Sequence, residues 1–156
     1  MNKKQKSLTN KGFSLVELII VIAIMAVLVG VLAPQFIKYV ERSRKSTDVQ
    51  NVASIVTALQ TYAADPMVAS GSELKTGAVI TLKPGDGVAV SASNASNNAD
   101  LALKNAGIDK IGLKSKEWTA TAGEDVTITV TISNGTVTFT EGNVKDNHSI
   151  LKGQYQ

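Results

Sequence analysis

Residues 11–18 read Lys11-Gly12-Phe13-Ser14-Leu15-Val16-Glu17-Leu18, and they open an apolar segment that continues to Ile37. No polar side chain interrupts this segment between Leu18 and Ala33. As an α-helix, residues 13–37 would rise about 37 Å, which exceeds the ~30 Å hydrocarbon core of a bilayer. A cleaved secretory signal should end at a small-x-small cleavage site, but this segment runs into Pro34 without one. The sequence therefore predicts a helix that stays in the membrane.

The helical pattern continues beyond the membrane segment. Apolar side chains recur at the spacing of one helix face, and polar side chains occupy the opposite face. Asp65-Pro66 should end this helix, because proline disfavours helical geometry in the residue before it and has no N–H to donate. A single helix from about Ser14 to about Ala64 would be roughly 75 Å long, so its first half should project from the globular part. The apolar face holds Val52, Ile55, Val56, Leu59, Tyr62 and Ala63, and the polar face holds Asp48, Gln50, Asn51, Ser54, Thr57 and Thr61.

The remainder of the chain is predicted to be a small β-rich domain. Residues 77–83 and 87–93 have the pattern of two short strands around the turn Pro84-Gly85-Asp86. A short helix through residues 101–104 should end at Gly107, because glycine is the residue that most often closes a helix.

The clearest strand signal lies in residues 125–140, where apolar residues alternate with threonines. The Asn134-Gly135 pair in the middle favours a two-residue hairpin turn. With that turn, apolar residues of the two strands face one another, so both strands share one apolar face. The amphipathic helix over residues 49–63 is expected to cover this face. The expected pairs are Ile132 with Val137 and Val130 with Phe139.

Composition and charge exclude several classes of function. The chain of 156 residues has 16 Lys and Arg against 13 Asp and Glu, and its formal net charge is +3. Lys3, Lys4, Lys6 and Lys11 lie near the N-terminus, so the remainder is close to neutral and implies no nucleic-acid partner. The absence of cysteine excludes disulfide scaffolds, zinc knuckles and thiol catalysis. No hydrolase, zinc-protease or nucleotide-loop motif occurs, so no catalytic residue, metal site, cofactor or enzyme activity is predicted.

Residues 11–40 resemble the signal segment of type IV prepilins. In that family a membrane peptidase cuts after a glycine and methylates the new N-terminal residue, which corresponds here to Gly12 and Phe13. The family's glutamate corresponds to Glu17, and its helix-bending proline corresponds to Pro34. The resemblance implies the ladle-shaped α+β pilin fold, in which a long N-terminal helix packs with its second half under an antiparallel sheet of about four strands. The implied segments are residues 1–12 as leader peptide, 13–37 as transmembrane and filament-core helix, 38–64 as its amphipathic continuation, and 65–156 as a β-rich head.

Glu17 lies about one turn into the predicted membrane helix, where an ionised carboxylate costs ~3 kcal/mol unless it is paired, protonated or near the interface. No basic residue follows it within helical reach. Cleavage after Gly12 would create an α-amine at Phe13, and in pilins the glutamate is thought to attract the amine of a neighbouring subunit. The resemblance therefore implies that Glu17 of one copy pairs with Phe13 of the next during assembly. The alternative is that Glu17 only extends to the membrane interface.

Gly30 and Pro34 together predict a weak point in the helix. Pro34 removes the hydrogen bond to the carbonyl of Gly30. Proline and glycine, the two residues with the lowest helix propensity, therefore weaken the same turn of the helix. The pattern indicates either an ordinary kink near the membrane surface or, as in related filaments, a site that loses helicity during assembly.

The resemblance also implies where the protein acts and with what. It predicts a single-pass precursor in the cytoplasmic membrane with an extracytoplasmic head, and then a homo-oligomeric filament on the cell surface. The implied partners are a prepilin peptidase, an inner-membrane assembly platform and other pilins. Two alternatives stay open: a pseudopilin of a type II secretion or competence system, and a single-pass membrane protein that displays a β-rich binding module.

The remaining polar and aromatic residues give weaker signals. His148 is expected to be an exposed bystander. Trp118 is expected in the core or at a half-buried strand position. Acids at three turn positions lack the spacing of a calcium loop and are interpreted as solvated, and three glycosylation sequons are attributed to chance. Charged residues after the membrane segment are expected either to pair between subunits or to be solvated. The acids are Asp86, Glu124 and Asp125, the sequons begin at Asn94, Asn134 and Asn147, and the charged residues are Glu41, Arg42, Arg44, Lys45 and Asp48.

Overall fold

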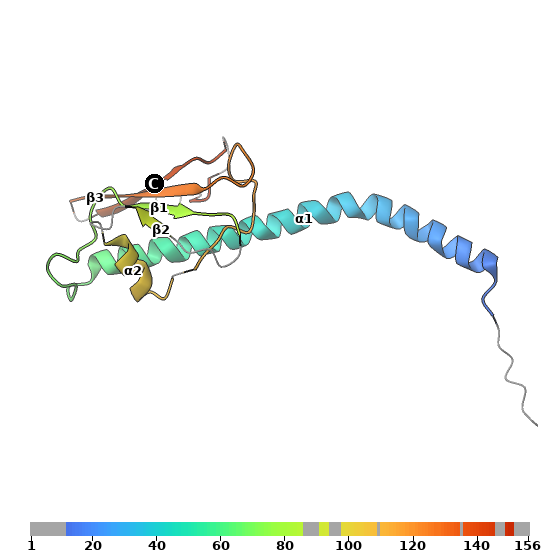
Figure 1. Cartoon of the computed structure of the whole chain (residues 1–156), viewed down its shortest axis with the longest axis horizontal. Helices are drawn as coiled ribbons and strands as arrows, with labels where there is room; N and C mark the ends of the chain where they lie inside the picture. The colour runs from blue at the N-terminus through green and yellow to red at the C-terminus, as the bar shows by residue number, and fades with distance from the viewer. Residues whose placement is uncertain are drawn as a thin grey trace, which may run out of the picture. The chain divides into compact units, whose positions relative to one another are not determined.

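The computed structural model describes residues 12–85, 91–93, 98–108, 110–134, 136–145 and 149–151. Contacts within the chain form two compact units, one ending at Val40 and the other beginning at Glu41. The described residues combine helices with an antiparallel sheet, so the predicted α+β class is confirmed. The elements in chain order are α1 (Leu15–Ala64), β1 (Val79–Leu82), β2 (Ser91–Ser93), α2 (Ala99–Asn105), β3 (Val126–Ser133) and β4 (Thr136–Gly142) (Figure 1).

The first unit is the N-terminal part of α1. This part contains a window of mean hydropathy 3.1, and none of that window is buried. By length and composition the helix can cross a membrane, as the sequence predicts. Its side chains are apolar on all sides, which is typical of a helix surrounded by lipid or by other helices.

The second unit is built on a four-stranded sheet in the order β2-β1-β3-β4, in which all neighbours are antiparallel. In the β3–β4 hairpin, Ile132 lies opposite Val137 and Val130 lies opposite Phe139, so the predicted register is confirmed. Asn134 has a φ of 51°, the left-handed geometry that a two-residue hairpin turn requires. The two short strands predicted in residues 77–83 and 87–93 correspond to β1 and β2, which pair antiparallel over residues 79–81 and 91–93.

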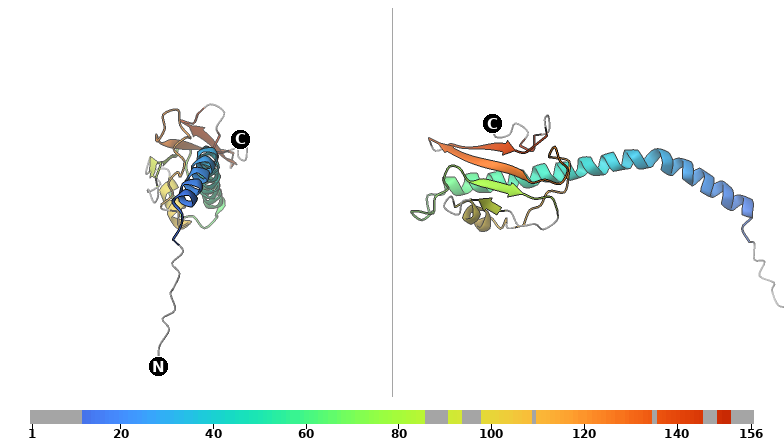
Figure 2. Two further views of the ribbon diagram at one scale, coloured as in Figure 1. Left: turned by 90° about the vertical axis from the view of Figure 1, so that its right-hand side faces the viewer. Right: turned by 45° about the horizontal axis from the view of Figure 1, so that its top comes forward.

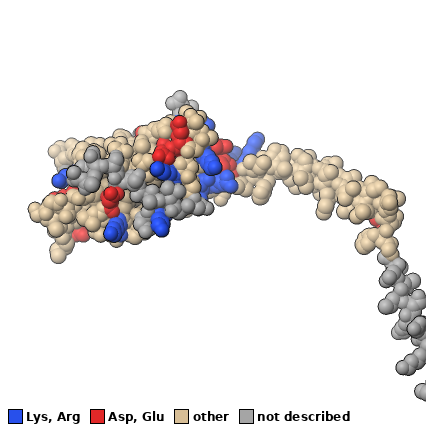
Figure 3. Space-filling view, viewed as in Figure 1, with Lys and Arg blue, Asp and Glu red and all other residues tan. Residues whose placement is uncertain are grey.

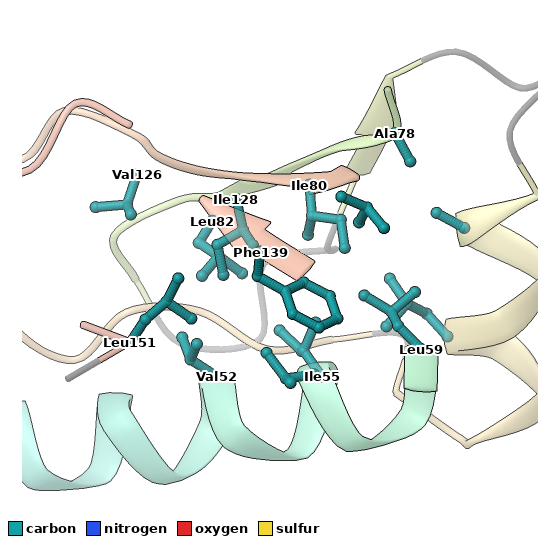
Figure 4. Close-up of a cluster of buried hydrophobic side chains, with 14 of the residues drawn as sticks. Val52, Ile55, Leu59, Ala78, Ile80, Leu82, Val126, Ile128, Phe139 and Leu151 are labelled. Atoms are coloured by element: carbon teal, nitrogen blue, oxygen red, sulfur yellow. The ribbon is translucent and has the colours of Figure 1, made fainter. Parts of the chain in front are cut away.

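The core of this unit lies between the sheet and the second part of α1, which runs along one face of the sheet (Figure 2). The predicted apolar stripe of the helix is buried except for Ala63, which is exposed. Ala63 lies in the last turn of α1, where it lines an open pocket with Asp65 and Pro66. Figure 4 shows the stripe in contact with the sheet, and the buried side chains include Val52, Ile55 and Leu59 from α1 and Ile80, Leu82, Ile128 and Phe139 from the strands.

The short helix α2 ends as predicted. Gly107 has a φ of 71°, and its N–H donates to the carbonyl oxygen of Lys104 at 3.0 Å. The N–H of Ile108 donates to the carbonyl oxygen of Leu103 at 2.8 Å. These two bonds form the glycine-terminated helix end in which the last carbonyls receive donors from the chain that follows.

Asp48 contradicts the sequence prediction. The prediction placed it on the polar face of the helix, but its side chain is fully buried. Its carboxylate accepts hydrogen bonds from the N–H of Lys114 at 2.6 Å, the N–H of Ser115 at 2.9 Å and the indole Nε1–H of Trp118 at 2.7 Å. These donors come from a segment far away in sequence, and they replace the water that the carboxylate loses on burial. Through these hydrogen bonds, Asp48 connects residues 114–118 to α1.

The charged residues around Asp48 also pair within the subunit. Lys45 Nζ lies 3.1 Å from Glu117 Oε2 and 5.9 Å from the centre of the Trp118 ring. Glu41 accepts a hydrogen bond from the hydroxyl of Ser115, and its Oε2 lies 3.6 Å from Arg44 Nη1. These contacts give Glu41, Arg44 and Lys45 partners within their own chain.

The interface between α1 and the sheet predicts a large effect of shortening one core side chain. We expect Ile55→Ala to lower the free energy of unfolding by about 2–5 kcal/mol, because Ile55 is fully buried and the change leaves a cavity. Denaturant unfolding of the full chain in non-ionic detergent measures this loss. The matched change on the exposed face, Gln50→Ala, should alter stability by no more than about 0.5 kcal/mol. Equal effects at the two positions would show that the helix does not cover the sheet.

The Asp48 contacts predict a second effect on stability. We expect Asp48→Asn to cost on the order of 3 kcal/mol, because the amide presents an NH₂ group to donors that need an acceptor. Trp118 emission should shift in the same variant, since a neutral amide replaces the charged carboxylate beside the indole N–H. Asp65→Asn is the control, because the exposed carboxylate of Asp65 accepts only from the N–H of Met67 among the hydrogen bonds described, and the side chain of asparagine can do the same. Unchanged stability and emission in Asp48→Asn would refute the assignment.

Candidate functional site

The first turn of α1 forms a reciprocal cap around Ser14 and Glu17. The N–H of Ser14 donates to Glu17 Oε2 at 3.0 Å, and the Ser14 hydroxyl oxygen accepts from the N–H of Val16 at 3.3 Å. The N–H of Leu18 donates to the carbonyl oxygen of Ser14 at 3.2 Å, which starts the helical ladder. This is a capping box, in which a serine and a glutamate three residues apart satisfy backbone donors that a helix start leaves free. The Ser-x-x-Glu spacing could have identified Ser14 from sequence, but its role was missed.

The hydrogen bond to the N–H of Ser14 positions the carboxylate of Glu17. The carboxylate lies at the N-terminus of a long helix, where the helix dipole favours negative charge. The N–H group that it accepts from belongs to the residue directly after Phe13. The Glu17 carboxylate therefore lies close to Phe13, where cleavage after Gly12 would create an α-amine.

Gly12 and Phe13 precede the helix. Both are exposed and neither is in a regular element, whereas the helix begins at Leu15. The Phe13 side chain is 91% exposed, so within its own unit it has almost no cover. A peptidase requires a target bond that it can reach outside regular secondary structure, and Gly12 and Phe13 are exposed and precede the helix.

The apolar side chains that follow are also exposed, and Figure 3 shows this part of α1 almost entirely as uncharged surface. Gly30 and Pro34 lie within α1, whose helical assignment continues through both residues. The helix contains a proline in its interior, where one hydrogen bond of the ladder is lost. The predicted loss of helicity at this point during assembly stays a prediction.

Among the residues that the structure describes, the other candidates from the sequence do not gather into a second site. Trp118 is buried in the core, which was one of the two positions predicted for it. It lies outside the strands, so the other prediction, a half-buried strand position, is wrong. Glu124 Oε2 accepts from Asn143 Nδ2 at 3.5 Å, and no metal-binding cluster of His, Asp or Glu occurs among the described residues. Asn134 forms the hairpin turn. Asp86, Asn94, Asn147 and His148 lie outside the described residues.

Comparison with known proteins matches the segment that carries the cap. Residues 8–33 match the family model of the prokaryotic N-terminal methylation motif. The chain is 40% identical over 53 residues to the type IV major pilin protein PilA of Myxococcus xanthus, covering 34% of this chain and 24% of that protein. It is also 40% identical over 55 residues to the type IV major fimbrial protein FimA of Dichelobacter nodosus, covering 35% of each chain.

The matched segments cover only about a quarter to a third of these relatives, so the likeness concerns the N-terminal part of the chain. No solved structure matches the chain. The matched residues nevertheless include the cap, the residues before it and the exposed apolar helix. Through this N-terminal segment, the chain is similar to type IV pilins and carries the prokaryotic N-terminal methylation motif.

Proposed function

We propose that the protein is a structural subunit of an extracellular type IV pilus, cleaved between Gly12 and Phe13 and assembled through α1. The observation that carries this proposal is the Ser14–Glu17 cap at the start of a long, exposed apolar helix. The relatives that match this segment are a major pilin and major fimbrial proteins, which supports a structural role. These names give no support to the pseudopilin alternative.

The physical reason for assembly lies in the unpartnered surface of α1. In lipid, an apolar helix gains little hydrophobic free energy by associating with identical helices, because both environments are apolar. Close packing and specific polar contacts must therefore determine how the helices align. Glu17 supplies such a contact if its carboxylate pairs with the new amine of Phe13 in a neighbouring copy, where the low dielectric strengthens the attraction.

The proposed sequence of events follows from this arrangement. The precursor crosses the cytoplasmic membrane once, with its head on the extracytoplasmic side, and a prepilin peptidase removes residues 1–12 and methylates Phe13. The assembly platform then moves the subunit into a filament with other pilins. The weak point at Gly30 and Pro34 lets the helix extend locally when the filament forms.

The proposal predicts the N-terminus of the mature protein. Mass spectrometry of surface filaments should find a chain that begins at N-methylated Phe13. Gly12→Val should block processing, because a branched side chain would then stand beside the bond that is cut. Lys11→Gln should leave processing unchanged, since other lysines remain in the leader. A filament protein that retains Met1 would overturn the proposal.

The charge pair predicts a separate defect in assembly. Glu17→Gln should reduce filament yield by at least about tenfold while Phe13 is still processed, because a loss of ~1.4 kcal/mol per subunit contact already gives that factor. Ser14→Ala should cause a smaller reduction, since it removes the serine half of the cap, worth ~1 kcal/mol. Glu73→Gln in the head is the control, because glutamine can still accept from the N–H of Gly71. Filaments as abundant as those of the unaltered protein in Glu17→Gln would contradict the pairing.

A further inference from the structure

A cleft lies in the second unit between the C-terminal end of α1 and the short helix α2 (Figure 1). Its volume is about 240 Å³, and one charged side chain, Asp65, lines it together with the amide of Asn105. No basic side chain lines the cleft among the described residues. The cleft therefore combines a largely apolar lining with a single negative charge. The apolar lining consists of Ala58, Tyr62, Ala102 and Ala106.

The polar groups of the cleft differ in how far their own chain satisfies them. The Thr61 hydroxyl donates to a carbonyl oxygen of the preceding helical turn at 2.8 Å, and the Tyr62 hydroxyl donates to the carbonyl oxygen of Ser72 at 2.8 Å. Asp65 Oδ1 accepts from the N–H of Met67 at 2.8 Å, but no hydrogen bond to its second oxygen and no ion pair occurs among the described residues. The carboxylate of Asp65 can therefore accept a donor from outside the chain.

A lysine side chain has the chemistry that this cleft can bind. Lysine packs its methylene stem along apolar surface and keeps its ammonium group at the edge, where an acceptor and water are within reach. The alanine side chains of the cleft leave room for such a stem, and the exposed carboxylate of Asp65 can accept from the ammonium group. The amide oxygen of Asn105 is a second possible acceptor.

Lys116, near the other end of the same unit, is a suitable partner for the cleft. It is exposed, and it forms no ion pair among the described residues. The N–H directly before it donates to Asp48, and its own carbonyl oxygen accepts from the N–H of Gly123 at 3.1 Å, so its backbone is fixed. Lys116 and Thr47 of α1 line one cavity, which places the lysine beside the beginning of the helical part of this unit.

We propose that Lys116 of one copy binds in the cleft of a second copy and pairs with Asp65 there. The inference rests on the proposed function, because copies that assemble through α1 have parallel helices. Thr47 and Asp65 lie about 27 Å apart along α1, so a stagger of that order between two parallel copies brings lysine and cleft together. A contact between two different patches of one molecule continues from copy to copy instead of closing into a dimer. It would therefore join successive heads along a filament.

Disulfide trapping tests this contact directly, because the chain contains no cysteine of its own. Filaments with Asp65→Cys and Lys116→Cys in every copy should give, after mild oxidation, a ladder of covalent dimers, trimers and longer chains on a non-reducing gel. The contacts of α1 should keep these copies in place without the ion pair. The combination of Asp65→Cys with Thr140→Cys is the matched control, because Thr140 is also exposed but lies on β4, and it should give no ladder.

Charge reversal tests whether the two side chains attract one another. Asp65→Lys and Lys116→Asp should each lower filament yield by at least about tenfold, since like charges then face one another at the contact. The double variant with both changes should recover most of the yield, which a purely structural role of either residue would not produce. Lys75→Asp makes the same change at an exposed lysine that does not line the cleft, and it should have no effect. If Asp65→Lys destabilises the head, Asp65→Asn keeps the bond to the N–H of Met67 and should give a smaller loss of yield.

Two results would overturn the inference: filaments without a ladder from the Asp65→Cys and Lys116→Cys pair, or a double charge reversal as defective as the single ones. Filaments that begin at N-methylated Phe13 together with either result would contradict only the head contact. A chain that keeps its leader and forms no filaments would contradict the proposed function. The contact can then be tested by mixing two concentrated, uncleaved chains in non-ionic detergent, one with Asp65→Cys and the other with Lys116→Cys. A mixed disulfide dimer would support the contact, and its absence would overturn it.

Discussion

One helix, α1, has to satisfy two different surroundings, and the rest of the structure follows from this constraint. Its N-terminal part is apolar on all sides and has no cover within its own unit. From Asp48 onward its apolar residues narrow to one stripe, which the sheet covers completely at Val52, Ile55 and Leu59. A helix can be stable in both settings because its backbone hydrogen bonds are internal, and only the side-chain pattern has to change. The sheet can pack against α1 only where the apolar side chains form this single stripe.

The start of the same helix presents a different problem, because polar backbone groups are exposed there next to an apolar surface. Helix starts leave N–H groups without acceptors, and in a lipid environment water is not available to replace them. The Ser14–Glu17 cap supplies acceptors from the chain itself. It also places a carboxylate at the positive end of the helix dipole, where its charge is least unfavourable. A single local motif thus stabilises the helix start and holds an exposed acidic side chain beside it.

Much of this architecture could be predicted from sequence because it depends on local periodicity. The 3.6-residue pattern gave α1, the alternation of threonine and apolar residues gave β3 and β4, and Asn134-Gly135 gave their register. The buried state of Asp48 could not be predicted in this way, since its three donors come from residues 114–118, far away in the chain. An aspartate among polar neighbours has the sequence pattern of a solvated residue.

Asp48 and Glu17 carry the same chemical group, but they differ in how many donors their own chain supplies. A carboxylate has about four acceptor positions. Asp48 fills three of them with donors from its own chain, all fixed by the fold, so it contributes to the stability of the head and little remains for a partner. Among the described residues, Glu17 accepts one hydrogen bond, from the N–H of Ser14, and it remains exposed, so it retains capacity for a further donor. In a low-dielectric environment an incompletely paired carboxylate is unfavourable, and a cation from another subunit would relieve that cost. The two acids therefore differ in saturation: the donors of Asp48 all come from the head itself, whereas we propose that Glu17 gains its remaining donor only in the filament.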